Sequence, residues 1–283
     1  MSLAERVIKN LEARRERIIN GEINCIPFPF SRFRDDIPGI EQGRYYIITG
    51  ATKSSKTQFA SYWGVFHPIL YAYAHPEQIS VKIFYAPLEE TKEAILERFM
   101  SFLLHIKEKI RISPTDLRST REDKVLDMEV LDILKREEFT KIISFFEQSI
   151  VWISSTNPTG INKELKAYAE ANGVIHTKDA KYKDEFGVVQ ETKAFDYYEP
   201  NNPKEYRIVF LDHISLLTIE RGTDLRQTMG KMSEYFVQLR NRYKYTIFSI
   251  HQQAMFEQTD AFKLEKLTPS IATLADNKAV ARD

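Results

Sequence analysis

The sequence predicts an α/β fold, with a mostly parallel β-sheet flanked by helices. Strand-like apolar segments alternate with helix-like segments along the chain, which is typical of βαβ units. With 283 residues, of which 43% are hydrophobic, the chain is long enough to bury a sizeable core. A polar loop follows the first of these strands and leads directly into a helix, an arrangement that suits phosphate binding.

The composition excludes several classes of protein. Forty basic residues balance forty acidic ones, so the net charge does not favour bulk attraction to nucleic acid. The single cysteine, Cys25, rules out an internal disulfide framework, and the six histidines are scattered without metal-ligand spacing. Because no apolar run is long enough to cross a bilayer and no leader pattern opens the chain, we expect a protein of a reducing, cytoplasmic compartment, with no membrane partner.

The first element expected is a helix over residues 2–19. Ser2 and Glu5 have capping-box spacing, and apolar residues recur at helical intervals as far as Ile18. The other face carries several arginines, which we interpret as a solvated surface. Docking of this helix onto a neighbouring copy is the alternative. Residues 1–22 are therefore assigned to an N-terminal helical segment.

The main domain is expected over residues 23–283 and begins with a proline-rich connector. Short apolar runs rich in β-branched and aromatic residues predict strands, at residues 44–49, 81–86, 150–154, 207–211 and 245–250. Helical periodicity predicts the segments between them, at residues 90–109, 122–135, 138–148, 159–173 and 224–243, with a further helix that begins at Lys56. Thr159 is the expected cap of the helix that it opens.

Residues 174–204 interrupt this alternation. Lysines and aromatic residues interleave there, as they do in surfaces that bind single-stranded nucleic acid, but acidic residues dilute the pattern. We favour a surface hairpin inserted into the domain over a contact with DNA.

The central motif lies between the first of these strands and the helix after it, and reads Gly50-Ala-Thr-Lys-Ser-Ser-Lys56-Thr57. A phosphate-binding loop needs backbone N–H groups that turn inward, a lysine that reaches the β- and γ-phosphates and a hydroxyl that binds Mg²⁺. Gly50, Lys56 and Thr57 occupy these places. Ser55 replaces the glycine that usually precedes the lysine, at an expected cost of about 1 kcal/mol if the backbone there is left-handed.

Three other strand ends carry polar side chains that would complete such a site. Asp212 follows the strand predicted at residues 207–211. It would either hold Mg²⁺ through water beside the loop or cap the next segment. Glu89 would deprotonate the attacking water or serve as a first-turn acid of the next helix. Gln252 would donate a hydrogen bond to a γ-phosphate.

Together and in this order, these motifs resemble the ATPase domain of DnaB-type replicative helicases, a branch of the RecA-like P-loop NTPases. The stretches similar to the family's motifs are Tyr45–Thr57, Phe84–Glu89 with Arg98, Val209–Leu217, Phe248–Gln252 and Pro269–Asp283. The resemblance covers about residues 24–283. The sequences Lys-Ser-Ser-Lys and Asn-Lys-x-x-x-Arg-Asp within these motifs most resemble those of phage-encoded members.

The resemblance implies an ATP-dependent DNA helicase that moves along single-stranded DNA as a ring hexamer, in the cytoplasm of a bacterial or phage-infected cell. ATP, or another NTP, and Mg²⁺ would be its ligands, and a primase or a helicase loader would be its partner. An arginine finger would reach into the neighbouring subunit's site.

The resemblance also assigns roles to residues of this sequence. The nucleotide would be bound by Gly50, Ala51, Ser54, Ser55, Lys56 and Thr57. Lys56 would hold the β- and γ-phosphates, and Thr57 and Asp212 would hold Mg²⁺. Glu89 would be the general base, and Gln252 would report the state of the γ-phosphate. Lys278 and Arg282 would contact the DNA backbone.

Three features depart from the family pattern. Ser55 replaces glycine, and the family's separate N-terminal domain is reduced to a linker helix at 1–22. The sequence ends at Asp283, before the strands that carry the finger, so we expect a domain truncated at its C-terminal end. Two alternatives therefore stay open: a RecA- or KaiC-like recombination ATPase, and a nucleotide-binding assembly module with little hydrolysis.

Overall fold

The structure is a computed structural model that describes residues 3–51, 54–183 and 188–252. At its centre is a sheet of five strands in the order β3-β9-β8-β4-β5, in which every neighbouring pair is parallel. The strands are β3 (Tyr45–Gly50), β4 (Ser80–Pro87), β5 (Ile150–Trp152), β8 (Glu205–Asp212) and β9 (Thr246–Gln252). The predicted α/β class with a mostly parallel sheet is confirmed.

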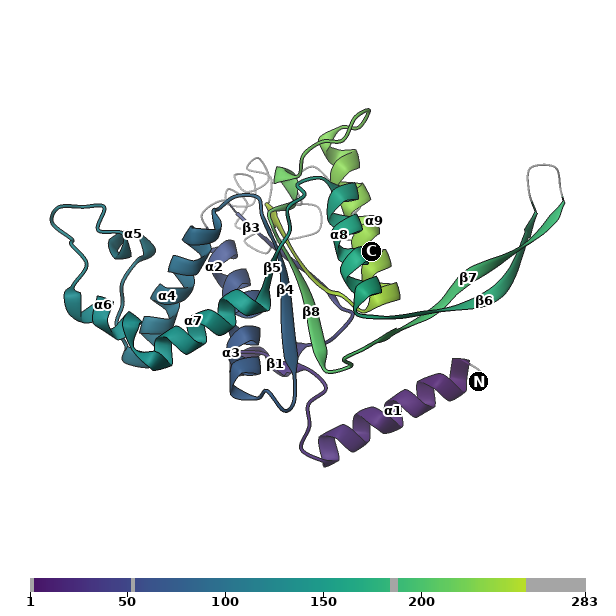
Figure 1. The fold of residues 1–283 in the computed structure, drawn as a ribbon, viewed down its shortest axis with the longest axis horizontal. Helices are drawn as coiled ribbons and strands as arrows, with labels where there is room; N and C mark the ends of the chain where they lie inside the picture. Colours follow the sequence, from purple (N-terminus) through teal and green to yellow (C-terminus); the bar gives the residue numbers. More distant parts are fainter. Residues whose placement is uncertain (1–2, 52–53, 184–187, 253–283) are drawn as a thin grey trace, which may run out of the picture.

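Helices cover both faces of this sheet (Figure 1). One layer contains α2 (Lys56–Ser61), the π-helical turn η2 (Tyr62–Phe66), α3 (His67–Ala74), α4 (Lys92–Glu108) and α7 (Glu137–Ser149). The other contains α8 (Pro158–Ala171) and α9 (Leu225–Tyr243). Along β4, Ile83 and Tyr85 pack into the first layer, whereas Phe84 and Ala86 pack into the second. The central strands β4, β8 and β9 are largely buried on both faces, which explains why most of their residues are apolar.

Several elements begin or end at other residues than the sequence predicts. Helix α6 (Met128–Lys135) begins at Met128 and not at residue 122, because the side chain of Asp127 caps its first turn. Helix α8 is capped by Asn157, which accepts a hydrogen bond from the backbone N–H of Gly160 at 2.8 Å. The prediction that Thr159 is the cap is therefore wrong; Thr159 lies inside the first turn, behind Pro158.

The sequence patterns did not predict the shortest elements. These are β1 (Ile26–Pro27), the 3-10 turn η1 (Ser31–Phe33), β2 (Gly39–Ile40), α5 (Pro114–Leu117) and the 3-10 turn η3 (Ile214–Leu216). Strands β1 and β2 pair with each other, and Ile26, Phe28 and Ile40 join the core of the first layer. The connector is thus held against the domain, as Phe28 stacks edge-on against Trp63 with ring centroids 4.7 Å apart.

Two elements extend away from this core on the same side of the molecule (Figure 1). Helix α1 (Leu3–Ile19) lies apart from the sheet; Arg14 pairs with Glu41 at 2.9 Å, and Arg17 bonds Asn24 at 2.8 Å. Strands β6 (Gly173–Lys183) and β7 (Val189–Pro200) form an antiparallel hairpin between α8 and β8. The predicted interruption at residues 174–204 is therefore a β-hairpin.

Candidate functional site

A short polar segment joins β3 to α2. Strand β3 ends at Gly50 and α2 begins at Lys56, so the polar segment joins a strand to a helix N-terminus. A Cβ at Gly50 would lie 2.7 Å from Oγ of Ser54 and 3.0 Å from Cγ of Lys56. Glycine at position 50 therefore leaves room for the side chains of Ser54 and Lys56.

Ser55 adopts the conformation that explains why glycine is usual at this position. Its φ is 61° and its ψ is 24°, in the left-handed region that residues with a Cβ rarely enter. Ser55 thus holds the left-handed conformation that glycine adopts more easily. The expected penalty of about 1 kcal/mol is carried by this single residue.

A cavity of about 440 Å³ opens beside this loop. It is lined by Ser54, Ser55, Lys56, Thr57, Gln58, Glu89, Glu90, Arg98, Asp212, His213 and Gln252. These residues come from the carboxyl ends of β8 and β9, the segments that follow β3, β4 and β8, the first turn of α2, and α4. Parallel strands bring their carboxyl ends to one edge of the sheet. The structure thus brings together the predicted site residues Lys56, Thr57, Glu89, Asp212 and Gln252.

Asp212 is the buried acid of this cavity. It ends β8, is 4% exposed and accepts a hydrogen bond from the side chain of Thr57 on α2. Burial raises the pKa of Asp212 to about 6; the hydrogen bond from Thr57 opposes this shift, while Glu89 and Glu90 add to it. Its Oδ1 atom is buried and accepts no hydrogen bond from the described residues.

These observations fit a magnesium ion held at Thr57 and Asp212. The Oδ1 atom of Asp212 is available to a ligand. A nearby cation would stabilise the ionised carboxylate and so oppose the rise in its pKa that burial causes. Across the described ranges, no group of three or more His, Cys, Asp or Glu residues is placed to hold a metal. Mg²⁺ needs only one or two protein ligands where substrate phosphates and water complete its coordination shell.

Lys56 is the cation of the loop. Its Nζ atom donates a hydrogen bond to the backbone carbonyl of Ala51 at 2.6 Å. Partial burial lowers its pKa, and the negative charges of Asp212 and Glu89 oppose that shift. Lys56 therefore interacts electrostatically with both acids across the cavity, where it would meet phosphate oxygens that approach the loop.

Two adjacent carboxylates follow β4, and the structure distinguishes them. Glu90 forms a short ion pair with Arg98 of α4, and both side chains are about one-quarter exposed, at 29% and 22%. Glu89 is exposed to solvent, and its charge acts on Lys56, Asp212 and His213. Glu90 is thus held by Arg98, whereas Glu89 is the more exposed of the two carboxylates.

Four residues that line this cavity are not among the predicted site residues: Gln58, Glu90, Arg98 and His213. His213 follows Asp212, and its Nδ1 atom lies 2.6 Å from Oγ of Ser215; burial lowers its pKa. Glu90 is the neighbour of the predicted Glu89, and Arg98 belongs to a stretch that carries the family resemblance. That these side chains line the cavity depends on how the segments after β4 and β8 fold.

Two further predicted residues, Lys278 and Arg282, lie outside the described residues. Within the described part, no helix combines the length and the apolar character that a membrane crossing requires.

The chain matches no protein-family model and no curated protein in sequence. Among solved structures, it is similar to a DnaB-like replicative helicase, reported with its interactions with primase, with a TM-score of 0.60 and 13% sequence identity. The match covers 98% of this chain and 53% of the helicase chain, so the chain spans about half the length of that structure. The two share the RecA-like P-loop fold.

Proposed function

We propose that this chain is an ATP-hydrolysing motor domain of the DnaB-like kind, which drives translocation along single-stranded DNA. The observation that carries the proposal is the cavity at the carboxyl edge of the sheet. There a phosphate-loop lysine, a hydroxyl, two acids and an amide from four separate segments face one space. This set matches the needs of phosphoryl transfer from a nucleoside triphosphate.

Each residue has a distinct task in this proposal. Lys56 and the N–H groups of the loop bind the β- and γ-phosphates, and Gly50 allows the tight turn. Glu89, which is exposed to solvent in the cavity, accepts a proton from the attacking water. Gln252 donates its amide hydrogen to the γ-phosphate and so distinguishes triphosphate from diphosphate.

Mg²⁺ would be held by Thr57 and Asp212, and it would neutralise charge on the β- and γ-phosphates. The buried Asp212 is held in place by the bond from Thr57, so it does not have to reorganise on binding. A ring hexamer, a catalytic arginine from a neighbour, and contacts of Lys278 and Arg282 with DNA belong to the same proposal. The linker helix 1–22 and the domain 23–283 are its structural units.

Substitution of Lys56 tests the proposal. Lys56→Ala should lose Mg-ATP binding in calorimetric titration while circular dichroism stays that of the parent chain. The matched control is Lys163→Ala, which removes an exposed lysine of α8, in the layer on the other face of the sheet. Equal ATP affinity in all three proteins would refute the phosphate-loop assignment.

Motor activity requires a separate measurement. Hydrolysis should rise on addition of single-stranded DNA, and a duplex with a single-stranded tail should be unwound. Unwinding separates a helicase from a recombination ATPase, which pairs strands instead. Nucleotide binding with no turnover, with or without DNA, would instead identify a nucleotide-binding assembly module.

A further inference from the structure

Aromatic side chains gather where the proline-rich connector crosses the start of α2. Phe30 of the connector lies against Phe59 of α2, with the two rings nearly parallel, at 8°, and their centroids 6.1 Å apart. Tyr62 meets Phe30 edge-on at 5.3 Å, and Phe33 meets it edge-on at 6.5 Å. We call these four residues the aromatic platform.

The aromatic platform is exposed to solvent, although it rests on a buried residue. Phe30, Phe33 and Phe59 are 38%, 48% and 37% exposed. Phe28 is 1% exposed and packs against two of them, with ring centroids 5.9 Å from Phe30 and 5.7 Å from Phe33. Because the core beneath is already filled, the exposed parts of these rings remain for a ligand.

The aromatic platform adjoins the cavity along one face of the helix. Gln58 lines the cavity and is exposed. Tyr62 lies one helical turn further along, since its backbone N–H bonds to the carbonyl of Gln58, and residues at this spacing share a face. Phe59 directly follows Gln58. The face of the helix that begins at the cavity therefore ends at the aromatic platform.

The strand order sets the direction in which a bound nucleotide would point. The two acids that face the cavity belong to β8 and to the segment after β4, inside the sheet, whereas β3 is an edge strand. The γ-phosphate reacts beside these acids, so the rest of the nucleotide extends past Lys56 towards the β3 side. The aromatic platform lies on that side, because Trp63 contacts both Tyr46 of β3, at 4.9 Å, and Phe59, at 5.9 Å.

We propose that the aromatic platform is the subsite for the base of the nucleoside triphosphate, which stacks on the rings of Phe30 and Phe59. The inference rests on the proposed function, because the phosphates of the same molecule would occupy the cavity. Stacking on aromatic side chains is a general way to hold a base, since every base has a π-face. It also gives the exposure of these rings a purpose that packing of the core does not.

The charges around the aromatic platform favour a nucleotide over a nucleic-acid strand. Surfaces that bind single-stranded nucleic acid combine stacking rings with cations that follow the phosphate backbone. Here Arg32 and Arg34 are followed directly by Asp35 and Asp36, so residues 31–36 have no net charge. A nucleotide that is already held at Lys56 by its own phosphates needs no further cations beside its base.

The chemistry of the rings predicts which bases bind. Phenylalanine has no hydrogen-bonding group, so stacking on Phe30 and Phe59 does not read the donors and acceptors of a base. Purines offer a larger π-surface than pyrimidines do. We therefore expect ATP and GTP to bind alike, and both to bind more tightly than CTP and UTP.

Comparison of ATP with inorganic tripolyphosphate isolates the contribution of the base. In calorimetric titration with Mg²⁺ present, tripolyphosphate reports on the phosphate cavity alone. Phe59→Ala and Phe30→Ala should each raise the dissociation constant of ATP by roughly tenfold, the typical effect of losing one stacked base. The dissociation constant of tripolyphosphate should stay that of the parent chain. The two variants should also lose the preference for purines.

Three further variants separate stacking from a structural role. Phe59→Leu keeps an apolar side chain but removes the ring, so it should lose ATP affinity as Phe59→Ala does. Phe59→Trp keeps an aromatic ring and should bind ATP as the parent does. The matched control is Tyr73→Ala, which removes a 36% exposed ring of α3 that packs against Phe145, and it should change neither ligand.

The outcomes distinguish this inference from the proposed function. If Lys56→Ala changes neither ligand, the phosphate cavity is wrongly assigned and both fail. If Lys56→Ala abolishes binding of both ligands while the platform variants bind ATP as the parent does, only the base subsite is refuted. Equal losses of ATP and tripolyphosphate in the platform variants would also refute it. Loss of affinity for a labelled oligo-dT in fluorescence anisotropy, with ATP binding unchanged, would assign the aromatic platform to nucleic acid instead.

Discussion

The hydroxyl of Thr57 donates a hydrogen bond to the carboxylate of Asp212, across the cavity between the start of α2 and the end of β8. The two residues are far apart in sequence, and the parallel order β3-β9-β8 brings their elements to the same edge. The pair that we propose for Mg²⁺ is therefore built by the fold itself. The pair requires a buried carboxylate, and the effect of this carboxylate on the free energy of unfolding can be measured.

Asp212→Asn should stabilise the protein in the absence of Mg²⁺ and nucleotide. The folded-state pKa of Asp212 is raised from 3.8 to about 6, so its ionised form is disfavoured in the folded protein. This penalty is absent well below pH 4, grows as the pH rises towards 6, and is complete above it. Above pH 7 the variant should gain up to about 3 kcal/mol, since one pKa unit corresponds to about 1.4 kcal/mol.

Urea unfolding at a series of pH values measures this difference. The curves of the two proteins should meet at low pH and separate between about pH 4 and pH 6. The same variant should lose Mg-dependent nucleotide affinity, because an amide is a weaker ligand for Mg²⁺ than a carboxylate. A constant stability difference at all pH values would show that Asp212 does not titrate in this range.

Substitution of the adjacent acids distinguishes the general base. Glu89→Gln should keep nucleotide affinity but slow hydrolysis by roughly a hundredfold or more. Glu90→Gln breaks the ion pair with Arg98 and should lower stability by about 1 kcal/mol, with a smaller effect on turnover. Steady-state hydrolysis and thermal unfolding of both variants provide the comparison. A larger loss of turnover in Glu90→Gln would place the base one residue further along the chain.

Ser55→Gly should relieve strain in the phosphate loop. At φ 61° a side chain with a Cβ is disfavoured, so glycine should stabilise the folded protein by up to about 1 kcal/mol. Ser55→Ala keeps a Cβ in the same conformation and serves as the control, with no gain expected. Chemical denaturation of the three proteins gives the ranking. Equal stabilities for glycine and alanine would mean that the left-handed conformation costs nothing here.

The sequence was sufficient for the sheet and its helical layers because the buried parallel strands contain continuous apolar runs. Val209 and Phe210 face opposite layers, yet both are buried, which makes β8 easy to recognise. The boundaries of α6 and α8 were predicted less well, since Asp127 and Asn157 compete with neighbouring residues as caps. The short strands β1 and β2 have no periodicity to detect.

The sequence could predict which site residues lie close together only where the strand topology places them at the same edge of the sheet. Asp212 and Gln252 end parallel strands, and such ends must meet. The ion pair of Glu90 with Arg98 depends on how α4 packs beside the loop, which no local pattern encodes. The pairing of the hairpin lysines with acids likewise depends on cross-strand register, which the sequence alone left open.

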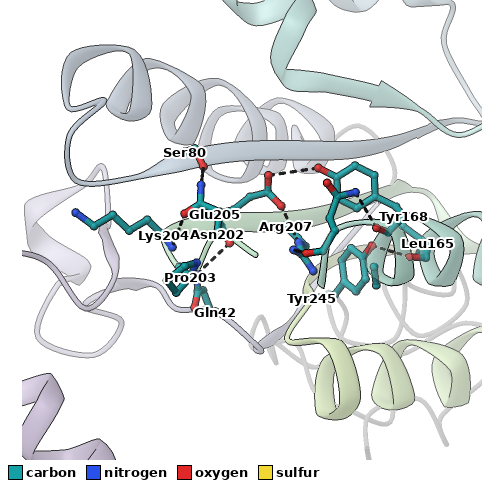
Figure 2. A network of polar contacts seen from close by, with 12 residues as sticks. Gln42, Ser80, Leu165, Tyr168, Asn202, Pro203, Lys204, Glu205, Arg207 and Tyr245 are labelled. Atoms are coloured by element: carbon teal, nitrogen blue, oxygen red, sulfur yellow. Dashed lines mark hydrogen bonds and ion pairs between the residues drawn. The ribbon is translucent and has the colours of Figure 1, made fainter. Parts of the chain in front are cut away.

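A final relationship links the hairpin to the sheet through Arg207. Its guanidinium is 3% exposed and bonds Glu205 and Tyr198, and its third contact is the carbonyl of Asn172 at 3.0 Å. It also lies over the ring of Tyr168, 5.7 Å from the centroid. Glu205 accepts from the Tyr168 hydroxyl as well, at 3.3 Å (Figure 2). This buried cluster holds β7, β8 and α8 together.

Arg207→Met should therefore destabilise the domain by about 3–5 kcal/mol, because it leaves the carboxylate of Glu205 buried without its cation. Tyr198→Phe keeps the ion pair and should cost only about 1–2 kcal/mol. The double variant Arg207→Met with Glu205→Gln removes both charges, and it should recover a large part of the loss. Urea unfolding of these four proteins and of the single variant Glu205→Gln completes the comparison. If the effects of the two substitutions simply add, Arg207 and Glu205 are not coupled, and the base of the hairpin is held by packing alone.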